Sequence, residues 1–361
     1  MKIRSAEARY YRWPRPVPVS NGTHTWTDMQ MGVVTITSDD GLTGIGIGSG
    51  SPGERQFREE FCTRILGMDA TLTELIWAML SDSKMYGRRG FETAALSPID
   101  MALWDIKAKR AGLPLHRLIG GYRDRVPIYI AGGYYSPDKS LRDLQAEMVA
   151  YVEKGAKAVK MKVGRVSQAE DAARVEAVRA AIGPDVKLMI DANCAYRAYE
   201  AVQFARRIEA FDISWFEEPV APEDYAGFSR IGMQTSIPIA AGEQEYRVHG
   251  FRDLIATGAI GIIQPDARWM GGVTEFMKVA ALAQARGLTV AAHGPQHIHL
   301  PLIGAIPNGI YAEYYDGDFD TPNGPIFEEE LSIDADGEVA LSKAPGAGYA
   351  LNEKVLAKLS W

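Results

Sequence analysis

Three acidic residues stand at equal intervals in the sequence, each directly after a short apolar segment. Asp191, Glu217 and Glu243 lie 26 residues apart. A strand, a helix and two loops together take roughly 25 to 30 residues, the size of a repeating βα unit. The spacing therefore predicts three successive parallel strands that each end in a carboxylate. Carboxylates that converge in this way repel one another unless a cation lies between them, and hard oxygen ligands favour Mg²⁺.

Two lysines, Lys160 and Lys162, end the predicted strand 157–162, which comes before the strand that ends at Asp191. Residues two apart on a strand face the same side. If parallel strands of this kind close into a barrel, its outer side is covered by helices, where ammonium groups are strongly disfavoured. We therefore expect both lysines to point into the barrel mouth. Neighbouring cations there would favour a neutral amine, so that at least one lysine could act as a base. The alternative is a pair of lysines that extend into solvent from a strand end.

Asp266 and His293 follow the sixth and seventh predicted strands. Neighbouring strand ends can bring a carboxylate within hydrogen-bonding distance of an imidazole, which orients the ring for acid or base catalysis. A single histidine would more often be structural, and the pairing with Asp266 favours catalysis. Glu313 ends the eighth predicted strand and could donate a hydrogen bond to a substrate oxygen if it stays protonated. The alternative role for Glu313 is a structural ion pair.

Further polar residues flank the three carboxylates. Asn193 lies on the same side as Asp191 and is predicted to reach a substrate hydroxyl or a metal-bound water. Glu218 follows Glu217 and should face away from the metal if the strand continues. Cys194 is predicted to be a small buried filler rather than a reactive thiol.

The segments that carry these residues predict a barrel. Eight strand-like segments alternate with helical patterns near residues 126–131, 157–162, 186–191, 213–217, 237–241, 260–264, 288–292 and 309–313. Eight units in one stretch favour an α/β fold with a closed TIM-like barrel over an open sheet, and we find no glycine-rich phosphate loop of the open-sheet type. The predicted domains are an α+β unit at 1–123, the barrel at 124–324 and a tail at 325–361 that packs back on the first unit.

The first unit is predicted to contain a hairpin, 33–37 with 44–48, and helices near 54–66, 73–80 and 91–110. Two of its segments could cover the barrel mouth and bind substrate. One is a polar loop at 14–30 that contains His24, and the other is 86–90 with Arg88 and Arg89. A solvated surface loop is an equal alternative for each.

Composition excludes several classes of function. The net charge is −7 and no run of lysine and arginine occurs, so a nucleic acid partner is not expected. Two cysteines are too few for a disulfide framework, and from the sequence we expect neither a signal peptide nor a membrane span of about 18 apolar residues. We expect a cytoplasmic protein with no membrane partner.

The whole set of motifs resembles the enolase superfamily, mandelate racemase subgroup. The resemblance covers almost the entire chain and includes Lys160-Met161-Lys162, Asp191-Ala192-Asn193, Glu217-Glu218-Pro219, Gly242-Glu243, Gln264-Pro265-Asp266, His293, Glu313 and, in the first unit, Asp100 to Lys107. It implies a (β/α)7β-like barrel with an α+β capping domain. It also implies a homo-oligomer, with an octamer as one candidate state.

The resemblance implies a role for each site residue. Mg²⁺ would be held by Asp191, Glu217 and Glu243. Lys162 would be the base on one face of the substrate, assisted by Lys160, with the His293–Asp266 pair on the opposite face and Glu313 on a carboxylate oxygen.

The implied reaction begins with removal of a proton α to a carboxylate, and the preferred outcome is dehydration of an acid sugar to a 2-keto-3-deoxy acid. The alternatives with the same residues are a racemase or epimerase of a 2-hydroxy acid and a sugar-lactone cycloisomerase. A metal-free glycosidase and a non-catalytic binding barrel are more distant alternatives.

Overall fold

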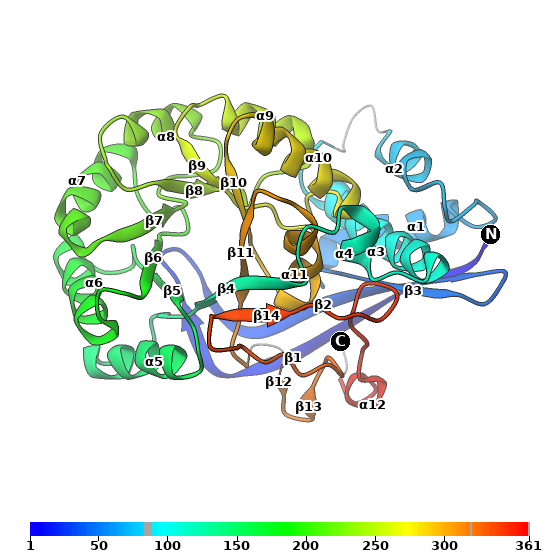
Figure 1. Cartoon of the computed structure of the whole chain (residues 1–361), viewed down its shortest axis with the longest axis horizontal. Helices are drawn as coiled ribbons and strands as arrows, with labels where there is room; N and C mark the ends of the chain where they lie inside the picture. Colours follow the sequence, from blue (N-terminus) through cyan, green and yellow to red (C-terminus); the bar gives the residue numbers. More distant parts are fainter. Residues whose placement is uncertain (83–87, 318–319, 360–361) are drawn as a thin grey trace.

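Eight parallel strands form a closed barrel in the middle of the chain (Figure 1). The structure is a computed structural model that describes residues 1–82, 88–317 and 320–359. The strands are neighbours in chain order, and the last pairs with the first through Ala312 and Ile128 to close the ring. They are β4 (Arg125–Ala131), β5 (Ala158–Lys162), β6 (Lys187–Asp191), β7 (Ile213–Glu217), β8 (Ile239–Ala241), β9 (Ile260–Ile263), β10 (Thr289–Ala292) and β11 (Gly309–Tyr314). The eight predicted strands are confirmed, with ends that differ by one or two residues.

Seven helices connect these strands and form the outer layer of the barrel, so the predicted (β/α)7β order is confirmed. Ser140 and Asp143 cap the first of them reciprocally. The helices are α5 (Leu141–Glu153), α6 (Gln168–Ile182), α7 (Ala198–Ile208), α8 (Tyr225–Gly232), α9 (Arg247–Ile255), α10 (Gly272–Ala285) and α11 (Gln296–Ala305), with the short 3₁₀ helix η1 (Glu209–Phe211) after α7.

Inside the barrel, a layer of apolar side chains lies beneath a layer of polar side chains. Its apolar core contains one buried layer of side chains, among them Ala158, Met189 and Trp215. Because side chains alternate across a strand, residues two positions further along face the same interior. Those positions are Lys160, Asp191 and Glu217, so the packed layer forms the floor beneath the polar groups.

A smaller α+β unit, on the right in Figure 1, precedes the barrel. Its elements are β1 (Ile3–Ser20), β2 (Thr25–Ser38), β3 (Thr43–Gly48), α1 (Pro52–Arg64), α2 (Thr73–Ser81), α3 (Phe91–Ala111) and α4 (Leu115–Ile119). The predicted hairpin is confirmed as the antiparallel pair β2–β3. Gly46 of β3 allows the sheet to lie directly on α3, because a Cβ there would meet the Pro98 carbonyl oxygen at 1.8 Å.

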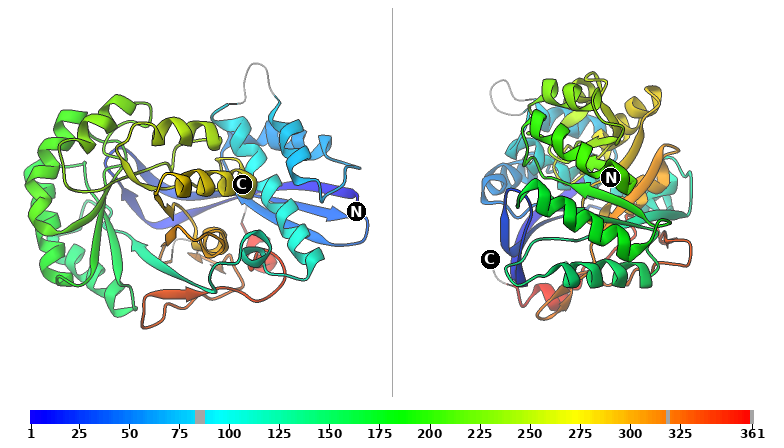
Figure 2. Two further views of the ribbon diagram at one scale, coloured as in Figure 1. Left: turned by 45° about the horizontal axis from the view of Figure 1, so that its top comes forward. Right: turned by 90° about the vertical axis from the view of Figure 1, so that its left-hand side faces the viewer.

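The predicted loop at 14–30 is wrong, since most of this segment belongs to the long antiparallel hairpin β1–β2. Pro14, Pro16 and Pro18 favoured a loop because proline has no N–H to donate. However, β1 is the edge strand of its sheet, and the pairing register shifts between Pro14 and Val19, where prolines are tolerated. Figure 2 shows this hairpin, in blue, reaching from the smaller unit to the barrel.

Two buried aspartates of α3 join the first unit to the rest of the chain. Asp100 accepts hydrogen bonds from the backbone N–H of Thr274 (2.9 Å) and from its hydroxyl (2.6 Å), at the start of α10. Asp105 accepts from the N–H of Ile45 (2.9 Å) in β3 and of Ala347 (2.8 Å) in the tail. These contacts give a physical reason for the acidic residues in the segment from Asp100 to Lys107.

The tail contacts both larger parts. It contains β12 (Asp320–Thr321), β13 (Gly324–Pro325), β14 (Glu338–Ala340) and α12 (Glu353–Leu356). β14 pairs with the barrel strand β4, while Glu353 forms an ion pair of 2.8 Å with Arg9 of the first unit. Ile333 forms an isolated antiparallel bridge with Val339. None of the helices among the described residues is long and apolar enough to cross a membrane.

Candidate active site

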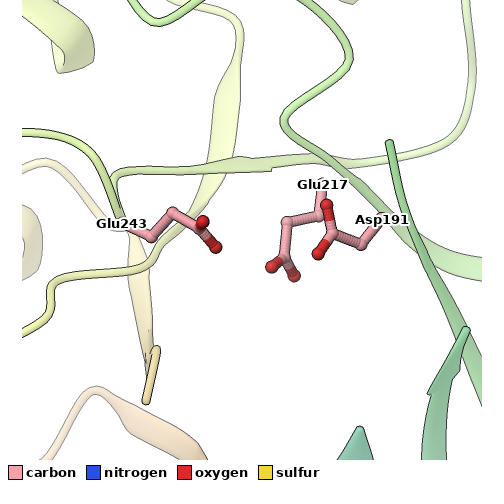
Figure 3. Close-up of side chains that lie close together, drawn as sticks. All are labelled: Asp191, Glu217 and Glu243. Carbon is pink, nitrogen blue, oxygen red and sulfur yellow. The ribbon is translucent and has the colours of Figure 1, made fainter. Parts of the chain in front are cut away.

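Three carboxylates meet at the carboxyl ends of adjacent barrel strands. Asp191 and Glu217 are the last residues of β6 and β7 and are partners in the ladder, and Glu243 follows β8. One oxygen of each lies within 4.8 Å of the others, and Figure 3 shows the three side chains directed at a common point. The equal spacing in the sequence thus becomes one cluster, because each βα unit returns the chain to the same edge of the barrel.

The cluster fits a divalent cation. Burial and the neighbouring carboxylates raise the pKa of Glu243 well above its ordinary value, and burial also raises the pKa of Glu217. Oε2 of Glu243 is buried and accepts no hydrogen bond from the described residues. A cation would remove the mutual repulsion and satisfy this oxygen, and an all-carboxylate ligand set suits Mg²⁺.

Both lysines of β5 point into the barrel mouth, as predicted. Nζ of Lys162 lies 2.5 Å from Oδ2 of Asp191, and Nζ of Lys160 lies 2.5 Å from Oε1 of Glu217 and 2.8 Å from Oε1 of Glu313. The expectation of a neutral amine is not met in this arrangement. Burial lowers the pKa of each lysine, but the facing carboxylates outweigh it and raise both pKa values above the ordinary one.

His293 and Asp266 form the predicted pair. The Nδ1 of His293 donates to Oδ2 of Asp266 over 2.8 Å, since a carboxylate can only accept, and this leaves Nε2 directed towards Glu243 at 3.3 Å. Burial lowers the pKa of His293, but Glu243 and Glu313 outweigh it and raise the pKa to about 9. Asp266 is also held by Arg268, whose guanidinium binds both carboxylate oxygens.

Glu313 is ionised rather than protonated in this arrangement. Burial raises its pKa, but Lys160 and His293 outweigh burial and lower the pKa to about 2. Its Oε2 accepts hydrogen bonds from the N–H of Gly294 (2.8 Å) and the hydroxyl of Tyr315 (2.9 Å). The sequence could not give this result because it depends on the short distance to Lys160.

A cavity of about 570 Å³ opens above these groups, within the range of small-molecule sites. Asn193 and His24 both line it, together with Lys162, Glu243 and His293. The side-chain oxygen of Asn193 is buried and has no partner among the described residues, so it is available to a ligand. Its backbone adopts a positive φ of 43°, where the N–H donates to Oδ1 of Asp191.

Arg88 and Arg89 do not line this cavity. Arg88 is exposed, and Arg89 forms an ion pair of 3.0 Å with Glu245. Tyr86 and Gly87, of the same predicted segment, lie outside the described residues.

Several cavity residues were missed by the sequence reasoning. They include Arg15, Asn21, Thr23, Trp26, Met29, Tyr134, Pro222, Arg268, Trp269 and Tyr315. Trp269 and Tyr315 had a usable signal, since each closely follows a predicted strand end. The residues between 15 and 29 belong to the segment 14–30 that was expected to cover the barrel mouth. Apart from His24 none of them was singled out, because their exact positions depend on the hairpin β1–β2.

Of the residues that flank the carboxylates, Glu218 agrees with the expectation and Cys194 does so only in part, since it was expected to be a buried filler. Glu218 is outside the carboxylate cluster, and its Oε2 accepts from Nε2 of Gln244 over 2.9 Å. Cys194 is partly buried at the cavity wall, and burial raises its pKa, which keeps the thiol protonated. His299 has a structural role, since it bonds to the Pro295 carbonyl and the Ala267 N–H.

The tip of the hairpin β1–β2 docks on the ends of β5 and β6. Gly22 makes this approach possible, because a Cβ there would meet the Ala192 carbonyl oxygen at 2.6 Å. Thr23 donates to the Asn193 carbonyl over 3.1 Å, and Arg165 donates to the Asn21 carbonyl over 3.2 Å. The tip, with His24, therefore forms one wall of the cavity.

Comparison with known proteins places this geometry in a family. Residues 4–120 match the model of the mandelate racemase / muconate lactonizing enzyme N-terminal domain, and residues 143–355 match the enolase C-terminal domain-like model. A 3,6-anhydro-alpha-L-galactonate cycloisomerase of Streptomyces coelicolor is 33% identical over 97% of both chains. An L-talarate/galactarate dehydratase of Salmonella typhimurium is 35% identical over 91% of this chain and 82% of its own. The crystal structure of a racemase from Streptomyces coelicolor with bound magnesium superimposes with a TM-score of 0.92 and 32% identity, over 99% of this chain and 100% of the other.

Proposed function

This chain belongs to the mandelate racemase / muconate lactonizing enzyme family of the enolase superfamily, and we propose that it is a Mg²⁺-dependent acid-sugar dehydratase. The observation that carries the proposal is that Lys162 and His293 line one cavity with the carboxylate Glu243 of the metal cluster. Two groups that can hold a proton, beside a cation site, suit removal of an α-proton followed by loss of a β-hydroxyl.

Each residue has a part in this reaction. Bound at Asp191, Glu217 and Glu243, Mg²⁺ would supply positive charge to the substrate carboxylate. Lys162, in its unprotonated form, accepts the α-proton at Nζ. His293, oriented by Asp266, donates a proton from Nε2 to the departing β-hydroxyl, which leaves as water.

The substrate carboxylate is held from the opposite side by buried groups. Lys160 donates a hydrogen bond to it from the barrel interior, and the ionised Glu313 holds the Lys160 ammonium group in place. Asn193 and His24 contact substrate hydroxyls, which is supported by their position in the cavity wall and by the unpartnered oxygen of Asn193.

An isomerase is the second candidate, and the cycloisomerase among the relatives favours it. The same residues would act, but His293 would return a proton to carbon instead of protonating a leaving oxygen. The substrate class, an aldonate or aldarate acid sugar, is shared by both reactions.

Two further properties complete the proposal. We propose a homo-oligomer, with an octamer as the state to test, which size-exclusion chromatography with light scattering would measure. We also propose a cytoplasmic location, supported by the unpaired Cys62 and Cys194.

Proton NMR of aldonates and aldarates incubated with the protein and Mg²⁺ in D₂O tests the reaction. Loss of the α-proton signal with a new 3-deoxy methylene signal is expected for a dehydratase, and a chelator should abolish it. Deuterium at the α-carbon with an intact β-hydroxyl would instead support the epimerase. Turnover that is indifferent to the chelator would rule out the metal-dependent mechanism.

A further inference from the structure

We propose that Tyr315 is a positioning residue for His293, and that its hydroxyl group sets the direction in which Nε2 presents its proton. Tyr315 lies one residue past the end of β11 and lines the active-site cavity. The proposal rests on the proposed dehydration, in which His293 protonates the leaving group. It adds a residue that neither the sequence motifs nor the metal cluster includes.

The Tyr315 hydroxyl is close to both His293, the proposed acid, and the buried Glu313. It donates to Oε2 of Glu313 over 2.9 Å, and its oxygen lies 3.4 Å from Nε2 of His293. Once its one hydrogen is given to Glu313, the phenol oxygen can only accept at its remaining lone pairs. It is therefore an acceptor for the Nε2 proton of a charged His293.

Without this acceptor, Nε2 faces only carboxylates among the groups that the structure records around it. Glu243 lies 3.3 Å and Glu313 3.7 Å from Nε2. Both carboxylates lie within ion-pair distance, and each would hold the proton more strongly than a neutral phenol does. The Tyr315 hydroxyl adds a neutral acceptor at 3.4 Å, from which the proton is more readily passed to the substrate.

The backbone of Tyr315 is fixed by the same segment that carries His293. Gln296, at the start of α11 and three residues after His293, donates to the Tyr315 carbonyl over 3.1 Å and accepts from its N–H over 3.2 Å. Glu313 accepts from Gly294 in that segment as well. The ends of β10 and β11 are therefore joined at three points, which holds Tyr315 in place relative to the imidazole.

In the step that this arrangement serves, the Tyr315 O–H bond stays intact. The electron pair of the C2–H bond first enters the substrate carboxylate to give an enediolate, to which a proton can return at C2. It then forms the C2–C3 double bond as the C3–O bond breaks with its electron pair remaining on oxygen. That oxygen takes the Nε2 proton of His293 and leaves as water, while the C2 proton resides on Lys162. Tyr315 acts only through the orientation of His293.

Tyr315→Phe removes the hydroxyl and keeps the ring, and Tyr314→Phe is its matched control. Tyr314 is the preceding residue, and its hydroxyl donates to the Leu331 carbonyl over 3.3 Å, on the side of the strand away from His293. Both variants should show circular dichroism spectra and unfolding temperatures like those of the parent. Each is then assayed with Mg²⁺ and an acid sugar that the parent dehydrates.

For Tyr315→Phe, we expect kcat to fall at least tenfold while KM stays within threefold of the parent, and we expect no change for Tyr314→Phe. Deuterium should also accumulate at C2 of recovered substrate, because proton removal by Lys162 continues while protonation of the leaving group slows. If kcat stays within twofold of the parent, if KM rises while kcat is constant, or if exchange and elimination fall equally, the proposal is overturned.

A second measurement needs no turnover and so separates this proposal from the dehydratase proposal. The protein has 6 histidines, and long-range ¹H–¹⁵N spectra resolve their ring nitrogens, with His293→Asn giving the assignment. The Nε2 signal of His293 should shift in Tyr315→Phe and not in Tyr314→Phe. An unmoved signal would refute the contact even if the enzyme proved to catalyse another reaction.

Discussion

At the scale of single residues, the two lysines of the site differ in their burial and in the number of carboxylates that hold them. Lys160, fully buried, is held between Glu217 and Glu313, whereas Lys162 lines the cavity and has its strong contact with Asp191 alone among the carboxylates within ion-pair distance. A buried charge held by two partners is expensive to neutralise. A lysine with one partner, in contact with the cavity, is the better candidate for a group that changes its protonation state.

The first prediction is that Lys162→Ala abolishes elimination while retaining substrate binding. A positioned general base contributes roughly 10²- to 10⁴-fold to a rate, so kcat should fall by about that factor. Steady-state kinetics and calorimetric titration with substrate measure the two effects. Lys157→Ala, an exposed lysine just before β5, is the control and should keep the parental kcat. A Lys162→Ala enzyme that works at the parental rate would contradict the assigned base.

At the scale of elements, the hairpin β1–β2 is the part of the first unit that lines the cavity. Its tip is held through Thr23 and Arg165 and by close packing at Gly22. The wall that His24 contributes to the cavity depends on this packing.

We predict that Gly22→Ala raises KM about tenfold, with little effect on global stability. The added methyl group would meet the Ala192 carbonyl at 2.6 Å, so the tip must move away from Asn193. A tenfold change corresponds to about 1.4 kcal/mol of lost binding. Gly261→Ala in β9 is the control, because a Cβ there meets no atom closer than 3.7 Å. Equal kinetics for the two variants would show that the tip can shift without consequence.

The contact between α3 and α10 gives a prediction about pH. Burial raises the pKa of Asp100 from 3.8 to about 7, against the hydrogen bonds from Thr274 that lower it. A folded-state pKa above the unfolded one means that the contribution to stability is present below about pH 4 and is lost as pH rises towards about 7.

Asp100→Asn should remove this part of the pH dependence. The parent is expected to lose on the order of 1 kcal/mol of unfolding free energy per pH unit between those limits, relative to the variant. Urea unfolding of both proteins at pH 5, 6, 7 and 8 measures the difference. Parallel stability profiles would indicate that Asp100 stays ionised throughout.

The elements also show what the sequence can and cannot predict. Short apolar segments that alternate with helical patterns predicted all eight barrel strands, because a buried parallel strand is apolar on both faces. The hairpin β1–β2 was not predicted, since the tolerance for Pro14, Pro16 and Pro18 depends on an edge position that only the assembled sheet defines. The antiparallel strand β14, in the tail, pairs with β4, which lies more than 200 residues earlier in the sequence. No local sequence pattern predicts this pairing.

At the scale of the whole molecule, the site also has features that local sequence patterns predict and features that only the assembled fold determines. Spacing brought Asp191, Glu217 and Glu243 together because each βα unit adds one strand to a closed ring. The ionisation of Lys160 and Glu313 was predicted incorrectly, because it depends on contacts below 3 Å between side chains from β5 and β11. Such distances follow from closure of the barrel, which is a property of the complete chain.

Closure also couples the metal site to the stability of the fold. Glu217 is buried, Glu243 is partly buried and both have raised pKa values, so the folded chain holds repelling groups that unfolding would release into water. A ligand that binds only the folded state stabilises it by RT ln(1 + [L]/Kd), about 2.7 kcal/mol at 100 times Kd. The carboxylates come from three strands, so the unfolded chain has no comparable site.

We therefore predict that Mg²⁺ raises the unfolding temperature of the parent by a few degrees relative to the chelated protein. Glu243→Gln should respond weakly to Mg²⁺, because it removes one of the three carboxylate ligands. Glu218→Gln is the control: burial raises the pKa of Glu218 to about 8, so its carboxyl group is largely neutral at pH 7 and glutamine replaces it closely. This control should keep the full response. Thermal unfolding with EDTA and with increasing Mg²⁺ measures all three, and an equal response of Glu243→Gln and the parent would exclude Glu243 as a ligand.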